Sequence, residues 1–435
     1  MNQRTLTRRA FLRVAGQASF GIGAGLALPQ LFLNRTRAAT GQNPSELIRV
    51  GFIGVGAQGR NNINALMKHA VAVCDVDQSH LASAAAHVEK ALGSKCKTFS
   101  DYRRLLEDKS IDAVCISTPD HWHALPAIHA CEAGKDVYVE KPMTLTIREG
   151  QVLEKTARRT GRIVQNGSQQ RSDTRFRRAC ELLRSGYLGR IKVIHVGLPG
   201  TNYADRAKPP LVPDREPPPE LDYDFWVGPA RWRPYNVNRV HYLFRFFWDF
   251  GGGQMTNWGA HHLDITQWAL GMDESGPVSI EASATWNPEG WFETPQTFEV
   301  IYEYANGLKV ITRSPSPRTG CRFECEKGVL HVNRGLLVTE PEELLAAAPA
   351  ETQVKLYQSA QHYQNWLDCI KSRQRPICDV AIGHRSSTVC HLGNIAIRTG
   401  KKVKWDPVKE QIIGDPALAV WTNNPYRAPW KLPQA

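Results

Sequence analysis

The sequence predicts an α/β protein in two parts, a doubly wound parallel sheet followed by a part built on an antiparallel sheet. An apolar strand runs directly into a Gly-x-Gly-x-x-Gly motif at residues 54–59. From 47 to 166 strand and helix patterns alternate, which indicates a parallel sheet with crossover helices. From 278 to 338 apolar and polar residues alternate along short strands, as in an antiparallel sheet with one covered face. We expect domains at 47–166 and 167–400, and a surface tail at 401–435.

The glycine motif has the spacing of a dinucleotide-binding turn. Gly54 would make the tight turn, Gly56 would let the backbone approach a pyrophosphate, and Gly59 would let helix and strand pack closely. The helix expected at 61–68 would offer free N–H groups and its positive dipole end to the phosphates. The motif alone is a weak signal, because the chain contains 34 glycines.

An acid after the next strand strengthens this interpretation. The apolar strand 70–76 carries Asp75 near its end, 21 residues after Gly54, where such folds carry the acid that binds the ribose. A carboxylate accepts a hydrogen bond from a ribose 2′-hydroxyl and repels a 2′-phosphate, so NAD is favoured over NADP. Arg60 and Lys90 leave NADP open as the alternative.

Composition and charge are those of an ordinary globular protein, with 42% of the 435 residues hydrophobic and 22% charged. The net charge of +12 falls to +6 without the first 40 residues, which hold six arginines and no acid. No basic run is interleaved with aromatic residues, so we expect no nucleic-acid partner. The ten cysteines are scattered, without a CxxC pair or a Cys/His cluster of zinc spacing, so we expect no metal.

The first 40 residues are interpreted as a twin-arginine export signal. Arg8 and Arg9 precede an apolar run at 14–33 that is rich in Gly and Ala. The alternative is a basic membrane anchor, but Pro29 makes this run a poor spanning helix, and we expect no stable membrane insertion. Because this route exports folded proteins, we expect a periplasmic enzyme that takes up its nucleotide in the cytoplasm.

Two strand ends carry candidate site residues. Thr118–Asp120 follows the strand expected at 113–117, and Glu140–Pro142 follows the strand expected at 136–139. Open α/β sheets bind their ligands at the carboxyl ends of their strands. A lysine at this edge, Lys141, beside an acid and held by a proline, is predicted to have a function.

A second segment with candidate catalytic residues, 251–264, begins with a run of three glycines and forms the start of a predicted helix. Asn257 and His261 are four residues apart and Asp264 follows three residues later, so the three are predicted to share one face of that helix. Before this helix lies a proline-dense segment, 205–229, that cannot be regular structure and is predicted to be a functional loop or an oligomer arm.

An aromatic and basic segment, 239–250, separates that loop from the helix. Its rings suit a sugar pocket, where aromatic faces stack on C–H groups and charged groups bind hydroxyls, and they suit an ordinary core equally well. The predicted substrate contacts are Arg245, Trp258, His261 and Asp264.

Several of these segments resemble one family. GFIGVGAQGR, CDVD, STPDHWHALPAIHACEAGKDVYVEKP and GGG…GAHHLD are similar to the glucose–fructose oxidoreductase, inositol dehydrogenase and rhizopine catabolism (Gfo/Idh/MocA) family, over about residues 47–400. The resemblance implies an N-terminal Rossmann domain and a C-terminal α+β domain with an open, mostly antiparallel sheet that serves as a homo-oligomer interface. It also implies binding of NAD or NADP and oxidation or reduction of a hydroxyl on a sugar, cyclitol or related small molecule.

The resemblance also assigns residues. The expected cofactor-binding residues are Gly54, Gly56, Gln58, Gly59, Asp75, Ser117, Thr118, Pro119, Asp120, His123, Glu140 and Lys141. The helix start of the family carries an acid four residues before a histidine, and here the histidine is His261 but the acid is replaced by Asn257. An asparagine can accept an imidazole N–H, yet it cannot stabilise an imidazolium by charge.

These assignments lead to a hypothesis for the chemistry. Hydride transfer to a cofactor needs a group that takes the hydroxyl proton, with a pKa near the working pH. We expect Lys141 and His261 to flank the reacting hydroxyl of a carbohydrate, with Asn257 orienting the imidazole. His261 suits the role of base without adjustment, and Lys141 suits it if its pKa is lowered.

Two other functions fit the same residues. The first is a glycosidase that uses tightly bound NAD to oxidise a sugar hydroxyl transiently, which acidifies the neighbouring C–H and allows elimination of the aglycone. An exported enzyme has no free NAD pool, so a cofactor that is bound and recycled is chemically sensible. The second is a non-catalytic sugar- or nucleotide-binding protein, which the asparagine at 257 makes more credible.

Overall fold

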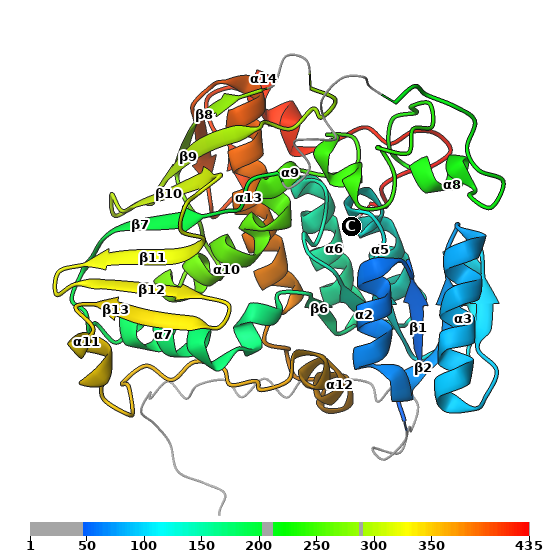
Figure 1. The fold of residues 1–435 in the computed structure, drawn as a ribbon, viewed down its shortest axis with the longest axis horizontal. Helices are drawn as coiled ribbons and strands as arrows, with labels where there is room; N and C mark the ends of the chain where they lie inside the picture. The colour runs from blue at the N-terminus through cyan, green and yellow to red at the C-terminus, as the bar shows by residue number, and fades with distance from the viewer. Residues whose placement is uncertain (1–46, 202–211, 287–289, 435) are drawn as a thin grey trace, which may run out of the picture. The chain divides into compact units, whose positions relative to one another are not determined.

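The computed structural model describes residues 47–201, 212–286 and 290–434. The predicted export signal at 1–40 lies outside them, as does part of the proline-dense segment. The described chain contains one six-stranded and one nine-stranded sheet (Figure 1). The predicted fold class, a Rossmann-like parallel sheet followed by a mostly antiparallel sheet, is confirmed.

The first sheet is parallel throughout, with strand order β3-β2-β1-β4-β5-β6. Its central strands β1, β4 and β5 are buried at every position, because helices cover both faces. The order reverses between β1 and β4, and ligands of open α/β sheets bind at such a reversal. Its strands are β1 Val50–Ile53, β2 Ala70–Cys74, β3 Lys97–Phe99, β4 Ala113–Ile116, β5 Asp136–Val139 and β6 Val164–Asn166.

Helices cover this sheet on both sides. One face packs against α2, α3 and α12, and the other face packs against α4, α5 and α6. The helix expected at 61–68 begins earlier, at Ala57, so its first N–H groups come directly after Gly56. These helices are α2 Ala57–Ala65, α3 Gln78–Leu92, α4 Tyr102–Glu107, α5 Ala124–Glu132, α6 Ile147–Thr160 and α12 His362–Ser372.

The second sheet has the strand order β13-β12-β11-β7-β10-β9-β8-β14-β15. All of its pairings are antiparallel except that of β7 with β10. Burial alternates along β9, as expected for a sheet with one covered face. Its strands are β7 Ile191–Gly197, β8 Ser279–Thr285, β9 Thr297–Glu303, β10 Lys309–Ser314, β11 Gly320–Cys325, β12 Val329–Asn333, β13 Leu336–Glu340, β14 Val403–Asp406 and β15 Gln411–Ile412.

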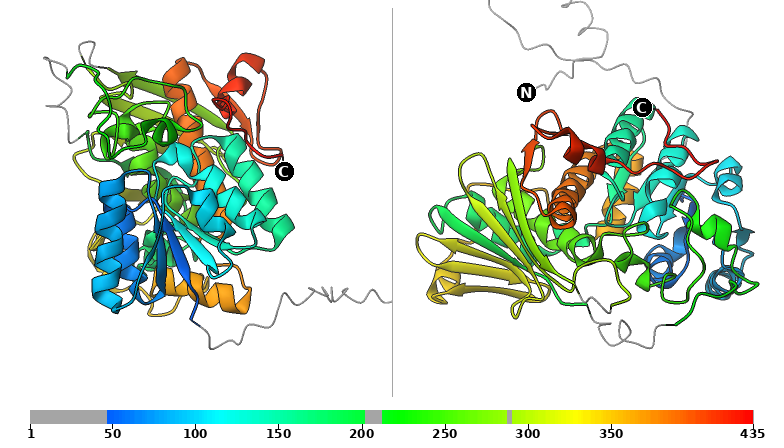
Figure 2. Two further views of the ribbon diagram at one scale, coloured as in Figure 1. Left: turned by 90° about the vertical axis from the view of Figure 1, so that its right-hand side faces the viewer. Right: turned by 90° about the horizontal axis from the view of Figure 1, so that it is seen from above.

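The covered face of the second sheet packs against α7, α10 and α13 (Figure 2). The helix α13 also contacts α6 and β6, so it joins the two halves. None of the helices in the described ranges is both long and apolar enough to cross a bilayer. The remaining helices are α7 Thr174–Arg184, α8 Tyr223–Val227, α9 Gly253–Asn257, α10 Gly259–Leu270, α11 Glu343–Ala346, α13 Val380–Thr399 and α14 Pro416–Ala419.

The segment 401–435 differs from the surface tail that the sequence predicted. Val403 and Trp405 are buried on one face of β14, which pairs with β8 and so extends the large sheet. Farther on, the Tyr426 hydroxyl donates a 2.6 Å hydrogen bond to the Glu149 carboxylate on α6. The apolar–polar alternation of 403–406 is a strand signal, too short to stand out from sequence alone.

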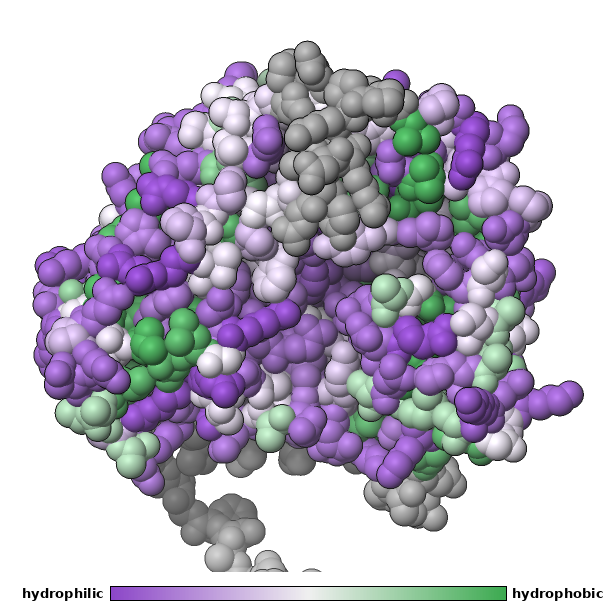
Figure 3. Space-filling view, viewed as in Figure 1, coloured by the Kyte–Doolittle hydropathy of each residue, from purple (hydrophilic) through white to green (hydrophobic). Residues whose placement is uncertain are grey.

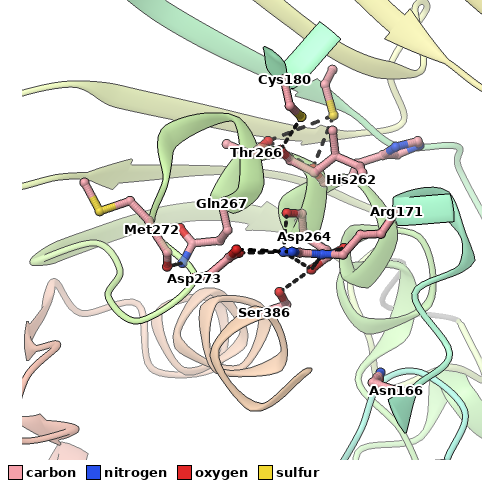
Figure 4. A network of polar contacts seen from close by, with 12 residues as sticks. Asn166, Arg171, Cys180, His262, Asp264, Thr266, Gln267, Met272, Asp273 and Ser386 are labelled. Atoms are coloured by element: carbon pink, nitrogen blue, oxygen red, sulfur yellow. Dashed lines mark hydrogen bonds and ion pairs between the residues drawn. The ribbon is translucent and has the colours of Figure 1, made fainter. Parts of the chain in front are cut away.

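A buried ionic network fixes α10 (Figure 4). The Arg171 side chain is 1% exposed, and its Nε lies 3.0 and 2.9 Å from the two carboxylate oxygens of Asp264. Its Nη2 donates to Asp273 at 2.7 Å, and the Ser386 hydroxyl on α13 donates to Asp264 at 2.6 Å. The prediction that Asp264 contacts substrate is wrong, because its carboxylate is occupied by a buried guanidinium and a hydroxyl.

Replacing Asp264 with Asn is expected to lower the free energy of unfolding by about 3–5 kcal/mol, because it leaves a buried arginine without its main counter-charge. Asp273→Asn is the matched control and should cost less, since the Asp273 side chain is 27% exposed. Urea unfolding measures both changes. An Asp264→Asn protein that keeps its stability but loses substrate affinity would contradict this assignment.

Candidate active site

A cavity of about 490 Å³ lies at the carboxyl edge of the parallel sheet, where the strand order reverses. Hydrophilic side chains border the hollow between the two halves on the face shown in Figure 3. Both halves of the chain line the cavity. The predicted site residues that line it are Gly54, Gly56, Gln58, Asp75, Ser117, Thr118, Pro119, Asp120, His123, Glu140, Lys141, Arg245 and Asn257. The predicted site residues outside its lining are Gly59, Trp258, His261 and Asp264.

The three motif glycines differ in what surrounds them. Gly54 has φ +80°, and a Cβ there would lie 2.6 Å from the backbone nitrogen of Thr118. A Cβ on Gly59 would lie 2.1 Å from the carbonyl oxygen of Gly54, so this glycine allows the close helix–strand packing that the sequence predicted. A Cβ on Gly56 would meet nothing nearer than the His80 ring at 3.6 Å. Gly56 is therefore the motif glycine that leaves room for a ligand.

The polar groups of the cavity fit a dinucleotide. No described side chain caps the N-terminus of α2, which leaves its first N–H groups for phosphates. At one end the Asp75 carboxylate accepts hydrogen bonds from the backbone nitrogens of Val55, at 2.8 Å, and Asp77, at 3.0 Å. Burial raises the pKa of Asp75. On the β4 side, the Thr118 hydroxyl is buried and has no hydrogen-bond partner within the described chain, so it can bind a ligand.

The Glu140 carboxylate is a fixed part of the site wall. Side-chain amides of Gln58, Asn62 and Gln169 donate to its Oε1 at 3.1, 3.2 and 3.2 Å. The side chain is buried, so these bonds replace water around a charge. Glu140 therefore anchors the end of β5 and fixes the backbone that carries Lys141.

Lys141 makes the central contact of the site. Its Nζ donates to the backbone oxygen of Asn257 at 2.9 Å and to the Asn257 side-chain oxygen at 3.1 Å. The Asn257 amide nitrogen donates to the Gln254 side-chain oxygen at 3.0 Å, which fixes the orientation of that amide. Burial, followed by the positive charge of Arg245, lowers the pKa of Lys141 to about 8.

The predicted pairing of Asn257 with His261 is wrong. The expected single helix is interrupted at Trp258, where α9 ends and α10 begins, and the Asn257 side chain binds Lys141 instead. His261 is buried, and its Nδ1 has no hydrogen-bond partner among the described residues. Burial and the charges of Lys141 and Arg334 hold the pKa of His261 well below its usual value. His261 is therefore neutral near pH 7, and Lys141 is the group that titrates close to working pH.

His123 and Asp120 complete the wall beside Lys141. The two ring nitrogens of His123 lie 2.6 Å from the Pro142 oxygen and 2.8 Å from the Thr118 oxygen, so this side chain ties the ends of β4 and β5 together. Asp120 is buried, and burial raises the pKa of its carboxyl against the opposite influence of His123, Arg245 and Lys141.

A segment from the second half lies against the cavity. The backbone of Gln78 donates to Glu220 at 2.9 Å, and Asp222 donates to Val76 at 3.1 Å, so the chain is tied to the end of β2. The Trp122 indole nitrogen donates to the Trp226 oxygen at 2.9 Å. Sequence reasoning proposed 239–250 as a pocket wall but did not identify the lining residues that precede it, Phe225 and Trp226. Their signal was the aromatic cluster at the end of the proline-dense segment.

One group of side chains in the described ranges brings metal-binding atoms close together. The ligand atoms of Asp77, His80 and His241 lie within 4.8 Å of one another. The three residues line the cavity beside Gly56, and the His80 and His241 rings contact each other edge to face at 4.9 Å. The sequence did not predict this cluster, because His241 lies far along the chain from the other two.

Family models match the chain over both halves. Residues 48–168 match an oxidoreductase family described by its NAD-binding Rossmann fold, and residues 174–432 match the C-terminal α/β domain of the same family. The chain belongs to the Gfo/Idh/MocA oxidoreductase family. The resemblance found from sequence is thereby confirmed, including the NAD-binding domain.

Individual relatives are more distant. An α-N-acetylgalactosaminidase of Shewanella oneidensis is 34% identical over 174 residues, which are 35% of this chain and 37% of that protein. The chain thus matches only about a third of the length of such relatives. Among solved structures, the WlbA dehydrogenase of Bordetella pertussis with NADH and UDP-GlcNAcA has a TM-score of 0.61 at 21% identity, over 83% of this chain and 99% of that one.

A second solved structure has the same fold. The scyllo-inositol dehydrogenase of Lactobacillus casei, with NAD(H) and scyllo-inositol, has a TM-score of 0.57 at 17% identity, over 82% of this chain and 99% of that one. At these identities the likeness establishes the fold. The chemistry of this chain therefore has to be argued from its own residues.

Alanine in place of the second or the third glycine of the motif is expected to affect different properties, cofactor binding for Gly56 and stability for Gly59. Gly59→Ala should lower the free energy of unfolding by about 1–3 kcal/mol, because its Cβ overlaps the Gly54 oxygen. Gly56→Ala should keep the stability but weaken NADH binding by about tenfold, since its Cβ occupies ligand space. Urea unfolding and NADH fluorescence titration measure the two effects. Unchanged NADH affinity in Gly56→Ala would contradict the placement of the phosphates.

Proposed function

We propose that this protein is an NAD-dependent oxidoreductase that moves a hydride to or from a hydroxyl-bearing carbon of a carbohydrate. The observation that carries the proposal is the Lys141 amine, which is half-buried in the cavity wall beside the nucleotide-binding edge and has a pKa lowered to about 8. An amine with that pKa exchanges protons readily near neutral pH, as a general base or acid must.

The residues of the chain divide the work of the reaction. A nicotinamide cofactor would supply the hydride acceptor or donor. Lys141, as the free amine, takes the hydroxyl proton in the oxidative direction, and as the ammonium it returns that proton in the reductive direction. Asn257 holds the Nζ atom through two oxygens, so the amine keeps one position in both states.

The same cavity supports the preference for NAD. Asp75 is the acid expected at the adenosine ribose, and it lines the cavity beside Val76 and Asp77. A phosphate on the ribose would face the two carboxylates of Asp75 and Asp77 there, which disfavours NADP.

The rate of sugar oxidation is expected to rise with pH through about pH 8, the pKa of Lys141. The sign follows from the role, because a general base acts in its deprotonated form and the amine fraction grows as the pH increases. The pH profile of kcat/KM measures this. A profile that is already flat above pH 7 would indicate a base that titrates well below pH 7, such as His261. That result would contradict the role of Lys141.

Lys141→Met is the matched variant for this profile. It should abolish turnover while NADH binding survives, since the cofactor contacts assigned to Asp75 and Gly56 remain. Lys109→Met, an exposed lysine change with the same loss of charge, is the control and should keep full activity. Full activity in Lys141→Met would end the proposal.

Redox-assisted glycoside cleavage is the second candidate function. The observation that favours it is the identity of 34% over 174 residues with an enzyme named as an α-N-acetylgalactosaminidase. Transient oxidation of a sugar hydroxyl acidifies the adjacent C–H, so the aglycone can leave by elimination, after which water adds and the hydride returns. This route needs no second carboxylate, in contrast to ordinary glycosidases.

Aryl glycosides distinguish the two candidates. A redox-assisted hydrolase is expected to release phenol without added NAD, at a rate lost in Lys141→Met. A simple dehydrogenase should instead release no phenol and should require NAD for turnover of free sugars. Absorbance of the released phenol measures the difference, with the Lys109→Met protein as the control.

Location and assembly remain predictions of the sequence. We propose export of the folded protein by the twin-arginine route, supported by Arg8 and Arg9 ahead of an apolar run. We also propose a homo-oligomer formed through the uncovered face of the nine-stranded sheet. Cell fractionation and light scattering of the purified protein test the two predictions.

A further inference from the structure

We propose that Asp77, His80 and His241 bind a divalent transition-metal ion such as Zn²⁺, which joins the two halves of the chain beside the nucleotide cavity. Asp77 and His80 lie at the start of α3 in the first half, and His241 lies in the segment 239–250 of the second half. The sequence predicted no metal, because these residues do not have zinc spacing along the chain. The proposal is independent of the reaction assigned to Lys141.

The ligand atoms of the three side chains lie close together, yet farther apart than hydrogen bonds allow. Asp77 Oδ2 lies 3.9 Å from His80 Nδ1 and 3.8 Å from His241 Nε2, and one ligand atom of each residue lies within 4.8 Å of the other two. Ligand atoms on one tetrahedral Zn²⁺ ion lie about 3.3 Å apart, since each is about 2.0–2.1 Å from the metal. Small rotations of the two histidine side chains would bring the atoms to that spacing.

The Asp77 carboxylate is fixed with one oxygen turned toward the histidines. Its Oδ1 caps α3 by accepting hydrogen bonds from the backbone nitrogens of Ser79, at 2.9 Å, and His80, at 3.1 Å. Its Oδ2 is the atom that faces both imidazoles. The side chain is only 9% exposed, so this oxygen is largely withdrawn from water. A metal ion would bind the carboxylate oxygen that the helix cap does not use.

The charge and the ligand types both favour a transition metal. His80 Nδ1 lies 3.9 Å from an oxygen of Asp75 and 3.9 Å from an oxygen of Asp77, so two carboxylates can offset the charge of a dication. Asp75 is already bound by two backbone N–H groups and is not needed as a ligand. One carboxylate with two imidazoles suits Zn²⁺ or Co²⁺, whereas Mg²⁺ and Ca²⁺ prefer sites made of oxygen atoms.

The three residues are also placed to act on the cavity. All of them line it, and the His80 ring lies 3.6 Å from the position of a Cβ on Gly56. The His80 and His241 rings already contact each other with their centroids 4.9 Å apart, although they come from different halves. Three protein ligands leave a fourth position of a tetrahedral ion for water or another ligand. A bound ion would therefore tie segment 239–250 to α3 and hold this wall of the cavity in place.

Metal content and a cobalt spectrum test the site. Tag-free wild-type protein, treated with EDTA and then incubated with Zn²⁺, should retain one ion per chain after gel filtration in metal-free buffer, as measured by plasma emission spectroscopy. With Co²⁺ it should show the intense visible bands of a four-coordinate ion in place of the weak bands of the hydrated ion. His80→Gln and His241→Gln should each weaken Zn²⁺ binding by about a hundredfold, measured by competition with a chromophoric chelator, and should remove the cobalt bands.

His87→Gln is the matched control. His87 lies on the same helix as His80, and its Nε2 lies 2.7 Å from the Asn64 side-chain oxygen, outside the cluster. This variant should bind Zn²⁺ as the wild type does. Lys141→Met should also bind Zn²⁺ unchanged, so failure of the proposed function and failure of the metal site give different results.

Hydrogen exchange tests the link between the two halves. Zn²⁺ should slow amide exchange in segment 239–250 of the wild type, and His80→Gln should abolish this protection, although the substitution lies in the other half. Four results would overturn the proposal: no ion retained by the wild type, retention that survives both histidine substitutions, the spectrum of hydrated Co²⁺ alone, or protection of segment 239–250 that persists in His80→Gln.

Discussion

The contact between Lys141 and Asn257 is the interaction on which the site depends. It joins the end of β5 in the parallel sheet to the end of α9 in the second half, across 116 residues of sequence. Burial and the positive charge of Arg245 disfavour the ammonium form, while the charges of Glu140 and Asp120 favour it. The two oxygen acceptors of Asn257 also favour a charged donor. The balance leaves an amine that is neither permanently charged nor permanently neutral.

The rest of the structure keeps these two ends together. Helix α13 packs against both halves, and the buried Arg171–Asp264 pair fixes α10 immediately after α9. The Glu140 carboxylate, bound by two amides of α2 and by the amide of Gln169, fixes the residue before Lys141. The charges of Asp264 and Glu140 are therefore satisfied within the protein and keep the two ends in place.

The parallel sheet and its glycine turn could be predicted from sequence because their signals are local. A buried strand, three spaced glycines and an acid 21 residues later all lie within one short stretch. The partners of side chains were harder to predict, since they depend on tertiary packing. Asp264 was assigned to substrate because its true partner, Arg171, lies 93 residues earlier, and nothing local in the sequence indicates that contact. Asn257 was paired with His261 because the spacing argument assumes one unbroken helix, whereas the helix is interrupted at Trp258.

The central claim is that Lys141 is an amine with a lowered pKa, and its titration can be followed directly. The measurement is the rate at which acetic anhydride acetylates Lys141, determined by mass spectrometry of the folded protein over a range of pH. The account predicts a midpoint of about 8. A midpoint near 10.5, the ordinary value for lysine, would show that the amine is charged at working pH and would contradict its role as the base.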